Sequence, residues 1–105
     1  MSVTVEFLPA AEIEYLDAVS YHIPAVGEVE VGIRFVEAVE EALRTILAAP
    51  DFWRVAGEPQ IRRYVLRKFP YVIYYRFHER EQLVTVHAAM HTSRKPGAWL
   101  GRRKK

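Results

Sequence analysis

The chain of 105 residues contains no cysteine, and this absence removes two classes of protein. It excludes a disulfide scaffold and a thiolate metal site, and it fits a reducing compartment. No apolar run approaches the roughly 20 residues that a membrane-spanning helix needs. The first residues, MSVTVEFLPAAEIEY, also lack the basic start and apolar stretch of an export signal. Together these absences predict a cytoplasmic protein.

Acidic residues are absent after Glu81, and the charge of the chain is strongly asymmetric. Residues 1–50 carry two cations and nine acidic side chains, a balance of −7, whereas residues 51–105 carry thirteen cations and four acidic side chains, a balance of +9. This asymmetry predicts a basic working face and an acidic back. The partner of the basic face would be nucleic acid or an acidic protein. The alternative is that the basic residues form a solvated chain end.

Half of the residues are apolar, so we expect one folded domain over residues 1–105, with residues 100–105 flexible. The fold class that we expect is α+β, in the order β-α-α-β-β-β. An antiparallel helical hairpin would cover one face of a four-stranded, mainly antiparallel sheet, and a short C-terminal segment would follow. Apolar periodicity predicts a strand near residues 2–8, helices from Pro9 to Ile23 and from Val29 to Ala49, and strands at Ile61–Leu66, Tyr71–Phe77 and Leu83–His91.

Each predicted helix has an apolar stripe, which indicates the face that packs on the sheet. In the first helix the stripe consists of Ile13, Leu16, Val19 or Ser20, and Ile23. In the second helix it consists of Gly32, Phe35, Val36, Val39, Leu43, Ile46 and Leu47. Residues 50–60 are predicted to form a loop. Phe52 and Trp53 are expected to pin this loop to the core.

The last predicted strand alternates between two faces, because successive side chains of a strand point in opposite directions. The side chains expected to face the helices are Val84, Val86, Ala88 and Met90. Those expected on the opposite face are Leu83, Thr85, His87, Ala89 and His91. The second set is less apolar and holds both histidines, so this second face is the one predicted to do chemistry or to bind a partner.

A metal site is not expected on this strand. Four residues of extended chain would place His87 and His91 about 13 Å apart. One metal ion with ligand bonds near 2 Å cannot bridge that span. The sequence also contains no other close pair of histidines at helical spacing. We therefore predict neither a metal nor any other cofactor.

Acid–base chemistry on a phosphodiester is a second possibility. Such a reaction needs a base, an acid and cations that stabilise developing charge. Arg76, His91, Arg94 and Lys95 would supply these groups if they converged at one end of the sheet. The alternative is structural: His87 is a half-covered residue and His91 merely ends a strand. Trp99 also has two interpretations, since it would either cover apolar atoms of the sheet or stack on a nucleobase.

The order of elements and two segments of the sequence resemble the RelE/ParE superfamily, the toxins of bacterial type II toxin–antitoxin pairs. One segment is RKFPYVIYYRF, residues 67–77. The other is the spacing of His91, Arg94, Pro96 and Trp99 after the last strand. The resemblance covers nearly the whole chain.

The superfamily contains two activities, and the residues of this chain favour one of them. RelE-like members cut messenger RNA on the ribosome, whereas ParE-like members are DNA gyrase poisons and not nucleases. RelE-type nucleases carry an arginine where this chain has Val72, a functional tyrosine at the position of Trp99, and an arginine that matches Ser93, with Arg94 one place later. These nucleases also carry lysines near the second helix and the strand that follows it. Residues 40–60 of this chain contain Arg44 and Arg54 but no lysine, so these lysines have no match.

The resemblance therefore implies a ParE-like toxin of the plasmid-stabilisation type that binds a target such as gyrase and is not an enzyme. The alternative that it leaves open is a ribosome-dependent endoribonuclease, with Arg76, His91 and Arg94 as the catalytic residues. A degenerate member that only binds is a third interpretation. A cognate antitoxin with a flexible acidic tail would be the partner. The residues predicted to bind target or antitoxin are Arg62, Arg67, Lys68, Tyr74, Arg76, His87, His91, Arg94, Lys95 and Trp99.

Overall fold

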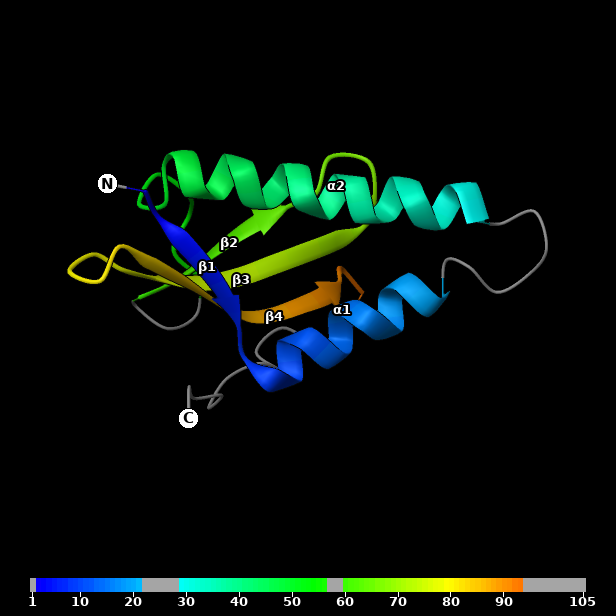
Figure 1. Cartoon of the computed structure of the whole chain (residues 1–105), viewed down its shortest axis with the longest axis horizontal. Coiled ribbons are helices and arrows are strands. Elements are labelled where there is room, and N and C mark those ends of the chain that lie inside the picture. The colour runs from blue at the N-terminus through cyan, green and yellow to red at the C-terminus, as the bar shows by residue number, and fades with distance from the viewer. Residues whose placement is uncertain (1, 22–28, 57–59, 94–105) are drawn as a thin grey trace.

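A four-stranded sheet with two helices on one side forms the described part of the molecule (Figure 1). The computed structural model describes residues 2–21, 29–56 and 60–93. The predicted α+β class and order of elements are confirmed. The elements are β1 (Thr4–Phe7), α1 (Pro9–Tyr21), α2 (Val29–Ala48), β2 (Ile61–Val65), β3 (Tyr71–His78) and β4 (Leu83–His91).

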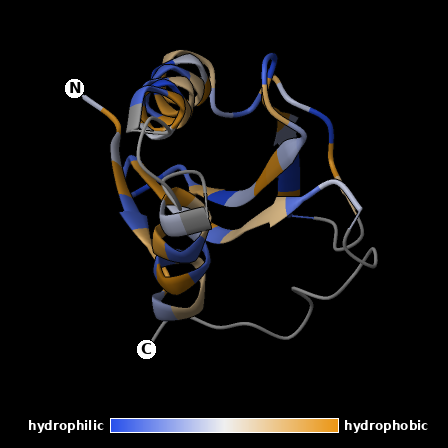
Figure 2. Ribbon diagram, turned by 90° about the vertical axis from the view of Figure 1, so that its right-hand side faces the viewer, coloured by the Kyte–Doolittle hydropathy of each residue, from blue (hydrophilic) through white to orange (hydrophobic). Residues whose placement is uncertain are grey.

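The strands lie in the order β1-β4-β3-β2, so the first and last strands of the chain are neighbours. β1 pairs with β4 in parallel, while the β2–β3 and β3–β4 pairs are antiparallel. The sheet is thus mainly antiparallel, as predicted. The apolar sequence of β3 fits its central position, because an inner strand is covered on both faces. Both helices lie on the same side of the sheet when viewed along their axes (Figure 2).

Helix α2 packs through the stripe that its sequence predicts. Phe35, Val39 and Ile46 of the predicted stripe are buried. Ala42, which was not included in the prediction, is buried on the same face. The ring of Phe35 lies 5.2 Å from that of Phe69 and 5.0 Å from that of Tyr71, measured between centroids. Phe35 therefore joins α2 to β3 and to the turn that precedes it.

Helix α1 packs through a different face from the predicted one. Ile13 and Leu16 are 59% and 55% exposed, so the predicted stripe of α1 is wrong for these two residues. Val19 of the same stripe packs against the core, and Ile23 lies outside the described residues. Ala11 and Ala18 face the sheet, because their small side chains allow α1 to approach it closely. The ring of Tyr15 fills the space between the helices and β1, 5.8 Å from Phe7 and 6.3 Å from Phe35.

The position of α1 protects an edge of the sheet. β1 pairs with β4 only as far as Val86, and β4 continues to His91. Beyond the end of β1, the backbone N–H of Ala89 donates a hydrogen bond of 3.1 Å to Oε1 of Glu14 on α1. A side chain of the helix thus takes the place of a neighbouring strand, which keeps this backbone donor satisfied.

The segment after α2 runs along the outer edge of β2. The N–H of Ala56 donates to the carbonyl of Ile61 at 2.7 Å, and the N–H of Arg63 donates to the carbonyl of Arg54 at 2.9 Å. Trp53 is half-buried against Tyr64, as expected. Phe52 is 72% exposed, so the expectation that it pins the loop to the core is wrong.

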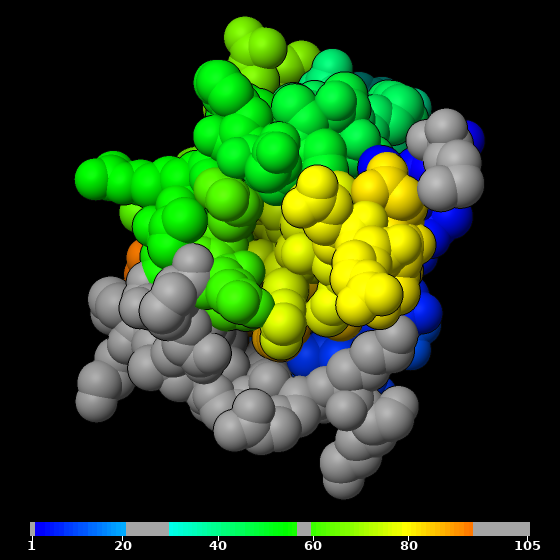
Figure 3. Space-filling model, turned by 90° about the vertical axis from the view of Figure 1, so that its left-hand side faces the viewer, coloured from blue at the N-terminus to red at the C-terminus, as the bar shows by residue number. Residues whose placement is uncertain are grey.

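The turn between β3 and β4 is the predicted polar hairpin connection. Gln82 has a positive φ of 51°, which is uncommon for a residue other than glycine. Its side-chain amide donates to the carbonyl of Glu79 at 2.7 Å, and its own carbonyl accepts from the N–H of Thr4 at 3.0 Å. This turn (yellow in Figure 3) lies beside the segment that follows α2 (green).

Replacement of Phe35 by alanine tests the packing of α2. We expect Phe35→Ala to lower the free energy of unfolding by about 3–5 kcal/mol, because a large aromatic side chain with three ring contacts would leave a cavity. Ile33→Ala on the same helix is the control, since Ile33 is exposed and its removal should change stability by only about 0.5 kcal/mol. Urea unfolding measures both values. Equal effects of the two substitutions would contradict the packing described here.

Candidate functional site

A β-bulge in β4 decides which side chains share a face of the sheet. Tyr74 of β3 lies opposite Ala88, but the next residue, Tyr75, lies opposite Val86. His87 is therefore the extra residue of the bulge, and the alternation of side chains is reversed on passing it. The prediction of uninterrupted alternation along this strand is wrong for the residues after His87.

Because of this reversal, residues 88–91 of β4 lie on the opposite side of the sheet from the predicted one, whereas the residues before His87 lie where they were predicted. Val84 and Val86 lie in the main core beneath the helices, as predicted. Ala88 and Met90 belong instead to a second cluster with Ile61, on the face turned away from the helices, which we call the distal sheet face. Ala89 and His91 lie on the helical side, opposite Ile73 and Tyr71 of β3.

His91 accordingly lies beside α1. Its ring is 5.3 Å from that of Tyr71 in an edge-to-face arrangement, and its Nδ1 accepts a hydrogen bond of 3.0 Å from the N–H of Ser93. Together with Glu14 and Asp17 of α1, the histidine lines a hollow of about 330 Å³. Among the described residues, the charged neighbours of His91 in this hollow are these two carboxylates.

Arg76 lies on the distal sheet face, far from His91. It is opposite Thr85 of β4 and Ile61 of β2 in the register of the sheet. His91 is opposite Tyr71, five residues away along β3, which corresponds to about 16 Å of strand. The predicted convergence of Arg76 with His91 is therefore wrong, because the two side chains are on opposite faces as well as apart along the strands.

The other predicted site residues are also distributed over separate surfaces. Arg62 faces the helical side, where its Nη1 donates to the carbonyl of Trp53 at 2.6 Å. Arg67 and Lys68 lie in the turn between β2 and β3, beside α2. Tyr74 shares the distal sheet face with Arg76. Arg94, Lys95 and Trp99 lie outside the described residues.

The distal sheet face carries two polar residues that were not among the predicted site residues, His78 and Arg63. Nε2 of His78 is 2.9 Å from Oγ1 of Thr85, whose side chain is fully buried. His78 follows Arg76 by two residues, so strand alternation places both on one face. Arg63 is opposite Tyr74 and adds a second cation to this face. The alternation of side chains along β3 would have been enough to predict that His78 lies on the same face as Arg76.

The helical side of β3 contains a perturbed tyrosine. The Tyr75 hydroxyl is buried and donates to the carbonyl of Pro50 at 2.7 Å, which ties the end of α2 to the sheet. Burial raises the pKa of Tyr75 to about 12, an effect that Arg62 opposes and Asp51 reinforces. This hydroxyl therefore acts as a structural hydrogen-bond donor and stays protonated at neutral pH.

Two further classes of site find no support in the described residues. Within residues 2–21, 29–56 and 60–93, no group of three histidine, aspartate or glutamate side chains is arranged to hold a metal ion. In the same ranges, no helix has the length and apolar character needed to cross a membrane.

Comparison with known proteins identifies the family. The sequence model of the "ParE toxin of type II toxin-antitoxin system, parDE" matches residues 5–96. The chain belongs to this ParE toxin family. A solved structure described as the "Chromosomal ParDE TA system from P. aeruginosa" shares its fold, with a TM-score of 0.68 over 86% of this chain and 96% of that one at 15% identity. A search of curated proteins gave no match.

The family assignment confirms the predicted resemblance to the RelE/ParE superfamily and its ParE-like branch. The chain is thus a ParE-type toxin of a type II toxin–antitoxin system.

The pKa of Tyr75 predicts how stability depends on pH. The folded-state value of about 12 lies above the usual value of 10, so the folded state holds this proton more tightly. The resulting stabilisation is complete below pH 10 and is lost as the pH rises toward 12. We expect the wild type to lose up to about 2 kcal/mol more than Tyr75→Phe between pH 9 and pH 12.

Denaturant unfolding of both proteins at each pH would measure this difference. At pH 7 we expect Tyr75→Phe to be less stable by about 1 kcal/mol, because the hydrogen bond to Pro50 is lost. Parallel stability curves for the two proteins up to pH 12 would contradict the assignment of a raised pKa.

Proposed function

We propose that this ParE-family toxin arrests growth by binding DNA gyrase, that it does so without cutting nucleic acid, and that a cognate antitoxin neutralises it. The family match over residues 5–96 supports the ParE type of activity. The binding region in this proposal is the basic C-terminal part of the chain, which includes Arg94 and Lys95.

The separation of Arg76 from His91 is the observation that carries the non-enzymatic part of the proposal. A general acid or base must lie within hydrogen-bonding reach of the reacting group, at about 3 Å or through one water. Groups on opposite faces of a sheet cannot act on one phosphodiester. The two best candidates for a nuclease among the described residues are therefore not arranged for a joint reaction.

Neutralisation by an antitoxin is supported by the charge of the chain. Residues 51–105 carry a balance of +9, so an acidic partner would be attracted and oriented by electrostatic forces. A flexible acidic segment that becomes ordered on the toxin would bury apolar atoms and pair with cations at the same time.

A supercoiling assay tests the gyrase target. We expect the purified protein to inhibit supercoiling of relaxed plasmid by DNA gyrase, and the cognate antitoxin to restore supercoiling. The double variant Arg94→Glu with Lys95→Glu should require at least about tenfold more protein for half-inhibition, since each reversal replaces attraction by repulsion. Arg80→Glu, in the exposed β3–β4 turn, is the charge-matched control and should inhibit like the wild type.

Two outcomes would reject this function. If supercoiling is unaffected over a broad range of toxin concentration, gyrase is not the target. If expression without antitoxin leaves growth unimpaired, the chain is a binding module without toxicity.

A ribosome-dependent endoribonuclease is the second candidate, and one observation favours it. Arg76 and His78 share the distal sheet face, with His78 hydrogen-bonded to Thr85. Ribosome-programmed mRNA cleavage by the wild type, by Arg76→Ala and by His78→Ala tests this alternative. Cleavage that both substitutions reduce by at least about a hundredfold would establish it, because general acid–base catalysis contributes that much. His91→Ala serves as the comparison, and unchanged cleavage would remove His91 from any mechanism.

A further inference from the structure

The outer edge of β1 is an edge of the sheet that no described element covers. β1 is the first strand in the order β1-β4-β3-β2, so one of its two edges has no neighbouring strand. In Figure 2 this strand, which follows the N-terminus, forms one margin of the described molecule, and neither helix lies outside it. Backbone groups at such an edge can pair with a further strand. The outer edge of β1 is therefore a candidate surface for association.

Alternate residues of β1 direct their backbone groups to this outer edge. The N–H of Thr4 donates to the carbonyl of Gln82 at 3.0 Å, and the N–H of Leu8 also donates to β4. The residues between bonded positions of a parallel pair turn their N–H and C=O groups away from the partner strand. Those of Val5 and Phe7 therefore point outward, and no described residue forms a hydrogen bond with them.

The other edges of the sheet are protected, which makes the outer edge of β1 an exception. Along the outer edge of β2, the N–H of Ala56 and the carbonyl of Arg54 form hydrogen bonds with that strand. Beyond the end of β1, the N–H of Ala89 in β4 donates to Glu14 of α1. Proline, lysine and bulges commonly prevent pairing at an open edge, and Thr4–Phe7 contains none of them. This edge thus keeps the features of a strand that pairs with another.

The sequence of β1 is complementary to itself in an antiparallel arrangement. A twofold axis at Val5 would place Val5 opposite Val5 of a second copy and Val3 opposite Phe7, with about six backbone hydrogen bonds between the copies. These three side chains are half-buried on the main core, so their pairing would cover apolar atoms that are still exposed. On the other face, exposed Thr4 would lie opposite exposed Glu6, so no two carboxylates would be directly opposed.

We propose that two copies of this chain associate through the outer edges of their β1 strands, with the twofold axis at Val5. The two four-stranded sheets then form one continuous sheet. Both ends of this joint sheet are β2 strands, whose outer edges are already covered by residues 54–56. Association therefore closes at the dimer and does not continue into a fibre. The inference depends neither on the target of the toxin nor on its antitoxin.

Residues 94–105, which lie outside the described part, are a poor alternative occupant of this edge. Their sequence is RKPGAWLGRRKK. Pro96 has no N–H to donate to a neighbouring strand, and Gly97 and Gly101 are unfavourable within strands. A strand of the cognate antitoxin is the other alternative, and the experiments below distinguish it from a second copy.

Sedimentation velocity of the purified full-length toxin tests the inference. We expect a dimer with a Kd between about 10 µM and about 1 mM, because a small interface gives a weak complex. Thr4→Glu would oppose two carboxylates at both symmetry-related positions and should weaken dimerisation about tenfold, whereas Thr4→Lys would pair opposite charges and strengthen it about tenfold. Ser20→Glu and Ser20→Lys, at an exposed position of α1, are the matched controls and should stay within about twofold of the wild type.

Hydrogen exchange of the wild type provides a second readout that needs no substitution. The amides of Val5 and Phe7 should exchange quickly in dilute protein and more slowly as the dimer forms. The amide of Thr4 is the internal control, because its bond to Gln82 is present in the monomer and the dimer alike. If a variant proves unfolded by circular dichroism and urea unfolding, this measurement decides the question.

Several results would overturn the proposal. A toxin that stays monomeric up to about 2 mM would do so, since an association weaker than this is not specific. Equal dimerisation of Thr4→Glu and Thr4→Lys would place the interface elsewhere. Protection of Val5 and Phe7 that appears only after addition of the cognate antitoxin would assign the edge to that protein. Protection at every concentration that is lost on deletion of residues 94–105 would assign it to the end of the chain itself.

Discussion

The extra residue at His87 is the constraint on which the arrangement of this molecule depends. The first half of β4 must place Val84 and Val86 beneath the helices, next to the parallel strand β1. After the bulge, the same side of the strand carries Ala89 and His91, which lie against α1. Without the bulge, Met90 would lie beneath α1 and His91 would face the opposite side of the sheet. One inserted residue therefore determines which chemical groups can meet.

Much of the fold could be predicted because its strongest signals are local. The apolar stripe of α2 repeats over about four turns, and apolar runs separated by a polar turn mark β3 and β4. The errors arose where tertiary packing overrides the local pattern. Ile13 and Leu16 have helical spacing, yet the two alanines of α1 face the sheet because they allow a closer approach. The bulge at His87 has no glycine or proline to reveal it in the sequence.

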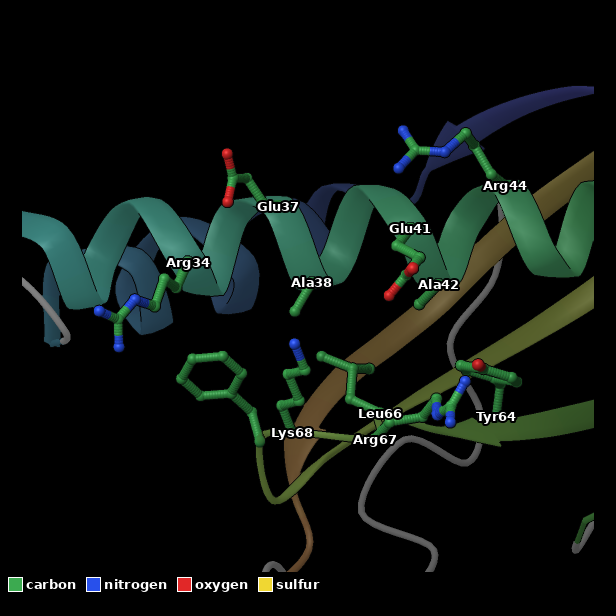
Figure 4. A pocket seen from close by; sticks show the side chains of 11 residues that line it. Arg34, Glu37, Ala38, Glu41, Ala42, Arg44, Tyr64, Leu66, Arg67 and Lys68 are labelled. Carbon is green, nitrogen blue, oxygen red and sulfur yellow. The ribbon is translucent and has the colours of Figure 1, made fainter.

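The charge of the second half of the chain could be read from the sequence, but the positions of its side chains could not. Charge counting identified the second half of the chain as basic, and the family assignment agrees with the predicted ParE type. Counting cannot show the direction in which a side chain points. Arg62 and Arg76 are on opposite faces of the sheet, although both were predicted for one surface. Glu41 and Arg67 line the same hollow beside α2 (Figure 4) although they are far apart in the sequence, so no spacing in the sequence indicates this hollow.

The parallel contact between β1 and β4 has a consequence for synthesis of the chain. The backbone N–H of Thr4 bonds to the carbonyl of Gln82, so this contact closes a loop of nearly the whole domain. The amino-terminal segment emerges from the ribosome long before its partner strand is translated. Contacts of such wide sequence separation form slowly, because the entropy of loop closure must be overcome first. The sheet is therefore completed only after translation of β4, so the chain cannot reach its folded form while it is still growing.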